Sequence, residues 1–224
     1  MKIKQLLTVF ILALIFVGST NGMSNQESPQ DMLFKGVEKN NINLVKDALK
    51  MGADVNAKDA NGNTALLNAS INENKYIIEL LLAAKANPNI QDKNGYTVLM
   101  RATLYGNENL IKLLLDAKTD PNIQNKNGYT ALMIVTLCRD KNIVKLLLGA
   151  NADLNLRNND GETAIDIARR KGFHEIEKIL KDEMEKQRLR VKEEIDQLNI
   201  LISDLADIVS EYIVCTKEPK KELI

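Results

Sequence analysis

The sequence contains little of what enzymes and metal sites need. Its 224 residues include one histidine, His174, two cysteines and no tryptophan. General acid–base catalysis and metal binding normally require several such side chains at close spacing. Cys138 and Cys215 lie far apart in the chain and form no metal or redox motif. We therefore expect no enzyme activity, no cofactor and no metal, and we expect His174 to serve local packing at the start of a helix.

The chain also lacks an excess of charge and has few aromatic residues. Thirty basic residues balance 30 acidic ones, so the formal net charge is zero. Nucleic-acid binding normally requires a basic face, so the balanced charge gives no reason to expect a nucleic-acid partner. Aromatic residues make up only 4% of the sequence. Such a composition suits thin, stacked helices better than a single thick core.

The one long apolar run lies at the N-terminus. In residues 1–22, two lysines precede an apolar segment at residues 6–17, and small or polar residues follow. This layout is typical of a secretory signal. Twelve residues form a helix of about 18 Å, shorter than a bilayer core of ~30 Å. We predict a signal peptide at residues 1–22, cleaved after Gly22 or after Ser19, with an uncleaved anchor as the alternative.

The signal peptide predicts an exported protein, either in a bacterial periplasm or secreted to the medium. After the signal is removed, we expect no membrane contact. Polar residues 23–30 are predicted to be a short linker because they contain Pro29 and show no periodicity.

A period of 33 residues dominates the rest of the chain. Glycines recur at this step, and a threonine follows each of them two positions later, at Thr64, Thr97, Thr130 and Thr163. The glycines themselves are Gly62, Gly95, Gly128 and Gly161. A fixed period of this length indicates a stack of supersecondary units, none of which can bury its apolar face alone. The predicted units are residues 31–58, 59–91, 92–124, 125–157 and 158–181.

The period and its glycine-x-threonine-x-leucine core resemble the ankyrin repeat. The resemblance covers residues 31–181 and implies an all-α ankyrin-repeat solenoid, in which helix-turn-helix repeats are joined by hairpin-like turns. It also implies a non-catalytic module for protein–protein interaction, whose partner is another protein. One departure concerns the glycine after the second helix, which survives as Gly52 but is replaced by Lys85, Lys118 and Asn151. A lysine in a left-handed conformation costs roughly 1 kcal/mol relative to glycine.

Residues inside each repeat have expected structural roles. The glycine permits a positive φ in the turn, and the threonine caps the first helix. The apolar stripe of the second helix, for example Leu110, Ile111, Leu113 and Leu114, is predicted to be core. Asp59, Asp92, Asn125 and Asn158 follow the structural period, so we interpret them as turn residues and not as calcium ligands.

A binding surface is predicted in the third and fourth repeats. In ankyrin-like stacks, the residues beside the turn glycine and the exposed side of the first helix line one concave face. Tyrosine and arginine are frequent hot spots of protein interfaces in general. The predicted protein-binding residues are Tyr96, Tyr129, Lys93, Lys126, Arg101, Leu104, Tyr105, Ile134 and Leu137. The alternative is that the C-terminal helix or internal packing covers this patch.

A long amphipathic helix follows the repeats. No glycine or proline occurs from Glu175 to Cys215, and apolar residues alternate at steps of four and three. This spacing predicts a heptad, coiled-coil helix at residues 182–216, followed by a charged tail at 217–224. The seam is formed by Met184, Val191, Ile195, Leu198, Ile202, Leu205, Val209 and Tyr212, with Arg188 as its polar member.

Such a seam needs a cover in water. The helix either pairs with another chain, which allows a homo-oligomer or a partner helix, or folds back on the repeats. Self-association would make the protein a structural or assembly protein in which the repeats act as a spacer. This is the alternative to the binding module.

Overall fold

The computed structural model describes residues 27–217, and within that range it leaves aside the side chains of residues 207 and 210–217. The predicted signal peptide and residues 218–224 of the predicted tail lie outside the described residues. The chain divides into two compact units, with the division between Arg101 and Ala102. We call these unit 1 and unit 2 and describe each by itself.

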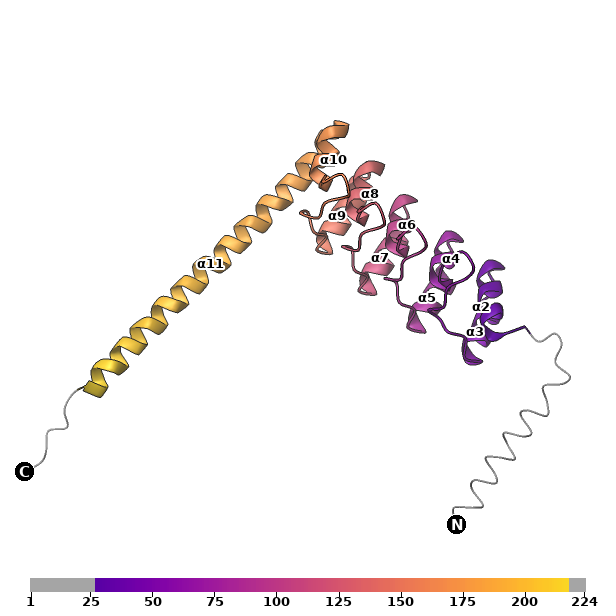
Figure 1. Cartoon of the computed structure of the whole chain (residues 1–224), viewed down its shortest axis with the longest axis horizontal. Helices are drawn as coiled ribbons and strands as arrows, with labels where there is room; N and C mark the ends of the chain where they lie inside the picture. The colour runs from indigo at the N-terminus through magenta and orange to yellow at the C-terminus, as the bar shows by residue number, and fades with distance from the viewer. Residues whose placement is uncertain (1–26, 218–224) are drawn as a thin grey trace, which may run out of the picture. The chain divides into compact units, whose positions relative to one another are not determined.

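Both units are built from helices, and no strand occurs in residues 27–217 (Figure 1). Unit 1 holds α2 (Pro29–Glu38), α3 (Ile42–Lys50), α4 (Ala65–Ile71), α5 (Lys75–Ala83) and the start of α6 (Val98–Leu104). Unit 2 holds the end of α6, α7 (Glu108–Asp116), α8 (Ala131–Cys138), α9 (Lys141–Gly149), α10 (Ala164–Lys171) and α11 (His174–Lys217). The all-α prediction, with a long C-terminal helix, is confirmed.

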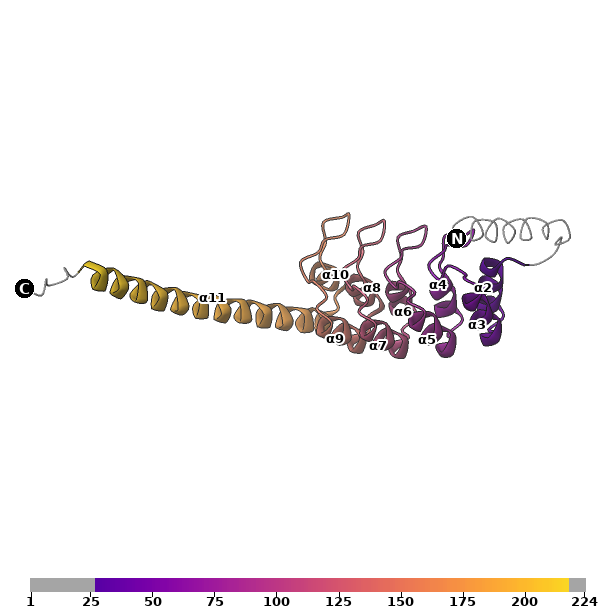
Figure 2. The ribbon, with the colours of Figure 1, turned by 90° about the horizontal axis from the view of Figure 1, so that it is seen from below.

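Within each unit the helices pack as pairs, and the neighbouring pairs of that unit pack on one another. In unit 1, α2 packs on α3 and α4, and α5 packs on α3 and α4. In unit 2, α8 packs on α9 and α10, while α11 packs on α10 and α9. Within each unit the loops between pairs project to the same side (Figure 2). We call α2, α4, α6, α8 and α10 the inner helices and the others the outer helices.

The periodic apolar residues form the core, as the sequence predicts. On the inner helices Leu66, Leu99, Leu132 and Ile165 are all buried. On α7 the residues Leu110, Ile111 and Leu114 are buried, but Leu113 is only half-buried. Leu80 and Leu146 repeat this behaviour, so this position of the outer stripe lies at the edge of the core.

Left-handed backbone recurs at three positions of the repeat, which are the turn glycine, the residue after the outer helix and the residue after the inner helix. The turn glycines have φ between 77° and 81°, as predicted. At Gly128 a Cβ would lie 2.7 Å from the backbone nitrogen of Asn159, so this site requires glycine for space as well as for φ. Lys85, Lys118 and Asn151 have φ of 67°, 62° and 61°, which places non-glycine residues in left-handed conformations after the outer helices.

The third left-handed position follows each inner helix and was not predicted from the sequence. Its occupants are Asn40, Glu73, Gly106, Arg139 and Gly172. They also recur every 33 residues. The signal was therefore present in the sequence, but only two of the five are glycine.

The first helix begins slightly earlier than predicted. Ser28 caps α2 by accepting a hydrogen bond from the Asp31 backbone N–H at 3.0 Å, and Pro29 stands at the first turn. Proline suits this position because its missing N–H would have no helical partner there. The predicted linker at residues 23–30 therefore loses its last two residues to α2.

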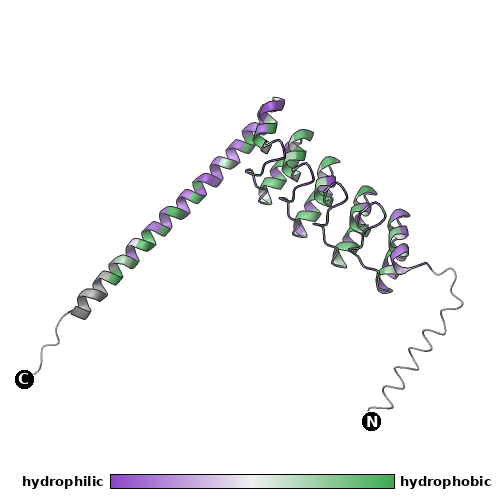
Figure 3. Cartoon of the chain, in the orientation of Figure 1, coloured by the Kyte–Doolittle hydropathy of each residue, from purple (hydrophilic) through white to green (hydrophobic). Residues whose placement is uncertain are grey.

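Helix α11 is continuous from His174 to Lys217, without a break at the end of the repeats. Ile176 and Leu180, in its first two turns, are fully buried. Beyond Lys181 no described side chain is buried, and apolar residues become more frequent towards the C-terminal half (Figure 3). In residues 27–217 no helix is long and apolar enough to cross a membrane.

Candidate protein-binding surface

Each hairpin-like turn is organised by one Asp or Asn side chain. Asp92 Oδ1 accepts hydrogen bonds from the backbone N–H groups of Asn94 at 2.8 Å and Tyr96 at 2.9 Å. Asn125 Oδ1 does the same for Asn127 and Tyr129, both at 3.0 Å. These contacts give the Asp and Asn residues the turn role that the sequence predicts. They also fix the backbone conformation at Tyr96 and Tyr129.

In unit 1 the second oxygen of Asp92 binds Arg101. Arg101 Nη2 donates to Asp92 Oδ2 at 2.5 Å, and the Arg101 guanidinium lies 5.1 Å from the centre of the Tyr96 ring. The Asp92 side chain is 3% exposed. Burial opposes ionisation of this carboxyl, but the hydrogen bonds from Arg101 and two backbone N–H groups outweigh it and hold its pKa below the usual range. Asp92, Arg101 and Tyr96 therefore form one cluster that is held by contacts within unit 1.

Arg101 was predicted to rim a binding patch, but it is engaged with its own unit. The reason is the turn residue nine positions before it, which is the aspartate Asp92. Asp59 stands in the same relation to Asn68, whose Nδ2 donates to Asp59 Oδ2 at 2.8 Å. An aspartate in the turn carries a second charged oxygen, and a buried carboxylate oxygen needs a donor.

Ile134 occupies the corresponding position in unit 2, and its predicted exposure is wrong. It is 5% exposed, and Ile167 in the next repeat is fully buried. Their turn residues are the neutral amides Asn125 and Asn158. No charged oxygen requires a donor there, so an apolar side chain fills the space and joins the core. Ile134 is thus a core residue and does not belong to the binding surface.

The remaining predicted residues of unit 2 are accessible to different degrees. Leu104 is 46% exposed at the end of α6, Tyr105 follows it at 60%, and Leu137 is 39% exposed near the end of α8. Lys126 is exposed and Tyr129 is half-buried. Leu104, Tyr105, Tyr129 and Leu137 are called the unit 2 apolar set below. Lys93, Tyr96 and Arg101 belong to unit 1.

An ion pair that the sequence did not reveal accompanies this set. Arg170 on α10 binds Glu162 through both carboxylate oxygens, at 2.5 and 2.9 Å. The hydrogen bond from Arg170 is the main reason that the pKa of Glu162 is lowered. Arg170 also interacts electrostatically with Tyr129. A charged, oriented pair therefore lies near the Tyr129 phenol.

The groups with chemical reactivity are poorly placed for catalysis. Cys138 is a free cysteine at the end of α8 and is largely exposed, and partial desolvation together with the nearby Asp140 carboxylate raises the pKa of its thiol. A raised pKa keeps it in the unreactive thiol form at neutral pH. Among residues 27–217, no three His, Cys, Asp or Glu side chains gather as metal ligands would.

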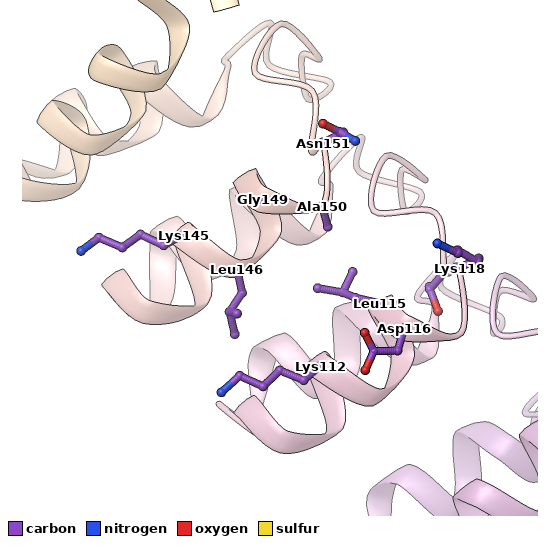
Figure 4. A pocket seen from close by; sticks show the side chains of 10 residues that line it. Lys112, Leu115, Asp116, Lys118, Lys145, Leu146, Gly149, Ala150 and Asn151 are labelled. Atoms are coloured by element: carbon purple, nitrogen blue, oxygen red, sulfur yellow. The ribbon is translucent and has the colours of Figure 1, made fainter. Parts of the chain in front are cut away.

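A groove runs between the outer helices α7 and α9 (Figure 4). Leu115 and Leu146 lie in the gap, and Lys112 and Lys145 extend from the two helices towards the same end of it. Lys112 is paired with Glu108 at 2.7 Å. The groove is shallow and combines half-buried leucines with exposed lysines, so it has no built polar site for a small ligand.

The comparisons agree with the repeat architecture. The family model for ankyrin repeats, in three copies, matches residues 33–125 and 104–190. The comparison with curated proteins found no match. The matched residues cover well over half of the chain and reach into every helix pair described above. The protein belongs to the ankyrin-repeat family, whose repeats are modules of protein–protein interaction and are typically non-catalytic.

Proposed function

We propose that this protein binds a partner protein through the unit 2 apolar set, on the face that the inner helices and turns of that unit form. The observation that carries the proposal is the exposure of Leu104, Tyr105 and Leu137. The helical period does not need large apolar residues at these positions. Contiguous exposed apolar groups on a folded protein usually mark an interaction surface.

The local structure favours unit 2 over unit 1 for the anchor. Lys93 Nζ donates to the Ala60 carbonyl at 2.7 Å, and Tyr96 lies beneath Arg101, so both are held by contacts inside unit 1. Tyr129 and Tyr105 are rigid, amphipathic side chains that lose little entropy when they bind. The Arg170–Glu162 pair supplies charge near Tyr129, and Lys126 is exposed three residues before it. A partner with an apolar centre and polar edges fits this composition.

The test uses alanine substitutions of the two tyrosines of the unit 2 apolar set, Tyr105 and Tyr129. Tyr105→Ala and Tyr129→Ala should each weaken binding by about 1–3 kcal/mol and leave the melting temperature nearly unchanged. The partner is first captured from the exporting cell with the protein as bait, and affinities are then measured by calorimetry. Tyr76→Ala is the matched control, because Tyr76 is a tyrosine that is 71% exposed on the outer helix α5.

Three outcomes would contradict the proposal. Unchanged affinity of both variants would show that the inner face of unit 2 is not the site. A large loss of stability would assign the tyrosines to the fold instead. An effect of Tyr76→Ala equal to the others would indicate that the partner binds the outer helices.

We also propose that the protein acts in an exported compartment, because residues 1–22 have the layout of a signal peptide. N-terminal sequencing of the protein from its own host should begin after Gly22 or Ser19. An intact Met1 in a membrane fraction would support the uncleaved anchor.

The exposed seam of α11 favours a second candidate function, that of an assembly protein. Val191, Ile195, Leu198, Ile202 and Leu205 are each more than half exposed. If this seam drives self-association, light scattering should find a dimer or larger species for residues 24–224 and a monomer for residues 24–181. Two monomers would exclude this function.

A further inference from the structure

The exposed seam of α11 follows a strict heptad. Positions a and d of a heptad face the partner helix in a coiled coil. If Arg188 is an a position, the next two a residues are Ile195 and Ile202, and the d residues are Val191, Leu198 and Leu205. The isoleucines and leucines among them are between 52% and 61% exposed. The chain therefore presents a complete coiled-coil seam with nothing of the described structure on it.

The repeats of the same chain are a poor cover for this seam. Folding back would require a hinge between Leu180, the last buried residue among the described side chains of α11, and Met184, where the seam starts. The helix is continuous through this stretch, and residues 175–217 contain neither glycine nor proline. Sharp helix kinks almost always occur at such residues. The cover must therefore come from another polypeptide.

The residue types at a and d favour a second copy of the same helix as that polypeptide. Isoleucine at a with leucine at d favours two parallel strands, because the two branched shapes fit the different packing geometries of the two layers. The chain has isoleucine at both central a positions and leucine at both central d positions. The sequence of α11 is thus suited to pair with an identical helix.

The polar residues beside the seam agree with a parallel pair. In parallel register, each g residue faces the e residue five positions later in the second helix. Glu194 then faces Asn199, Gln187 faces Lys192, and Leu201 faces Ala206. None of these is a like-charge pair. In the antiparallel arrangement that keeps the same apolar layers in contact, Glu194 would instead lie beside Ile208.

Arg188 supplies the register. It occupies an a position near the N-terminal end of the seam, where its side chain is exposed and lies 4.0 Å from Glu185 of its own helix. Only in-register pairing brings the two Arg188 side chains together and leaves every isoleucine layer intact. A single polar a residue is known to specify register and strand number at a cost in stability.

We infer that α11 binds α11 of a second copy of this chain as a parallel, in-register, two-stranded coiled coil. Ile195, Leu198, Ile202 and Leu205 form its apolar layers, and Arg188 sets its register. This inference rests on the assembly role proposed above and does not depend on the unit 2 apolar set. The pairing would present two sets of repeats from one dimer.

The first test compares two isoleucines of the full-length chain by light scattering. Ile200 and Ile202 are 62% and 61% exposed in α11, but Ile200 stands at the outward f position and Ile202 at a. We expect the unchanged chain and Ile200→Lys to be dimers, and Ile202→Lys to be monomeric, with a dissociation constant raised at least ~100-fold, which corresponds to about 2.7 kcal/mol. A monomeric unchanged chain would overturn self-association altogether. Loss of the dimer in both variants would overturn the two-stranded arrangement.

The second test measures direction and register by disulfide trapping. In the full-length chain with Cys138→Ser and Cys215→Ser, Val191→Cys places a thiol at a d position and Glu193→Cys places one at an outward f position. Two cysteines must have Cα atoms within about 7 Å to form a disulfide. Parallel in-register pairing brings the two copies of residue 191 together, whereas the antiparallel alternative separates them by about 27 Å.

Under mild oxidation, Val191→Cys should therefore give a covalent dimer on a denaturing gel, and Glu193→Cys should not. A dimer by light scattering without the Val191→Cys cross-link would overturn the parallel arrangement but leave the assembly function standing. Equal cross-linking of both variants would overturn the assigned seam.

Discussion

Helices α9 and α11 both carry an apolar stripe, yet the two stripes meet different surroundings. On α9 the residues Ile143, Val144 and Leu147 are fully buried. On α11 the residues Leu198, Ile202 and Leu205 are each more than half exposed. The difference is the neighbour, because α9 packs on α8 and α11, whereas α11 continues past the last helix pair. An amphipathic stripe therefore needs another surface packed against it. Neighbouring repeats provide that surface only as far as the repeat stack extends.

The largest expected effect distinguishes the two stripes directly. Leu147→Ala should lower the free energy of unfolding by about 2–5 kcal/mol, because it leaves a cavity in a packed core. Leu198→Ala should change it by less than about 0.5 kcal/mol at a dilution where the chain is monomeric, because this side chain has no neighbour to lose. Urea unfolding followed by circular dichroism measures both. Equal effects would show that α11 is covered within its own chain.

A smaller effect is expected from the ion pair of unit 1. Arg101→Ala leaves the buried Asp92 carboxylate without its side-chain donor, so the free energy of unfolding should fall by about 1–3 kcal/mol. Arg170→Ala is the control, since Arg170 and Glu162 form a similar pair that is open to water, where such pairs contribute little. The same urea experiment applies. No loss in Arg101→Ala would mean that the two backbone N–H groups suffice for Asp92.

Acid should weaken the protein through the same carboxylate. The pKa of Asp92 is lowered from 3.8, so the stability that its ionised form contributes is present above that value and is lost as the pH falls through the lowered pKa. We expect the free energy of unfolding to decline below about pH 4, and Asp92→Asn to reduce the steepness of that decline. A decline that Asp92→Asn leaves unaltered would assign it to the other lowered carboxyls, such as Asp59 and Asp166.

The smallest expected effect concerns a left-handed lysine. Lys118 has a φ of 62°, so Lys118→Gly should raise the free energy of unfolding by up to about 1 kcal/mol. Lys112→Gly, inside α7, should instead lower it by about 1 kcal/mol, because glycine is a poor helix former. Thermal unfolding of the two variants gives opposite shifts if the conformations are as described. A fall in both would argue against a left-handed Lys118.

Much of the fold could be predicted from sequence because it depends on period and local chemistry. Gly128 and Thr130 have local roles, a positive φ and a helix cap, that the residues themselves indicate. The continuous α11 follows from the absence of glycine and proline after Glu175. The left-handed position of Arg139 was missed because its residue type does not show it.

The candidate surface was less predictable, since burial depends on a second residue elsewhere in the chain. Arg101 and Ile134 occupy equivalent positions of successive repeats, and the period alone places both on an exposed helix face. The arginine lies against Asp92, and the isoleucine is buried in the core. A charged turn residue requires a donor and a neutral one does not, and this dependence is evident only once the turn and helix are seen together.

The sequence by itself determined the ankyrin-repeat architecture, the positions of its turns and the heptad seam, because each depends on spacing along the chain and on the conformational preferences of single residues. The tertiary structure decided which of the large apolar side chains are exposed. Leu104, Tyr105 and Leu137 remain accessible while Ile134 does not, and Leu180 is buried while Leu198 is not. The reason is physical, because a side chain's exposure is set by the neighbours that three-dimensional packing places against it.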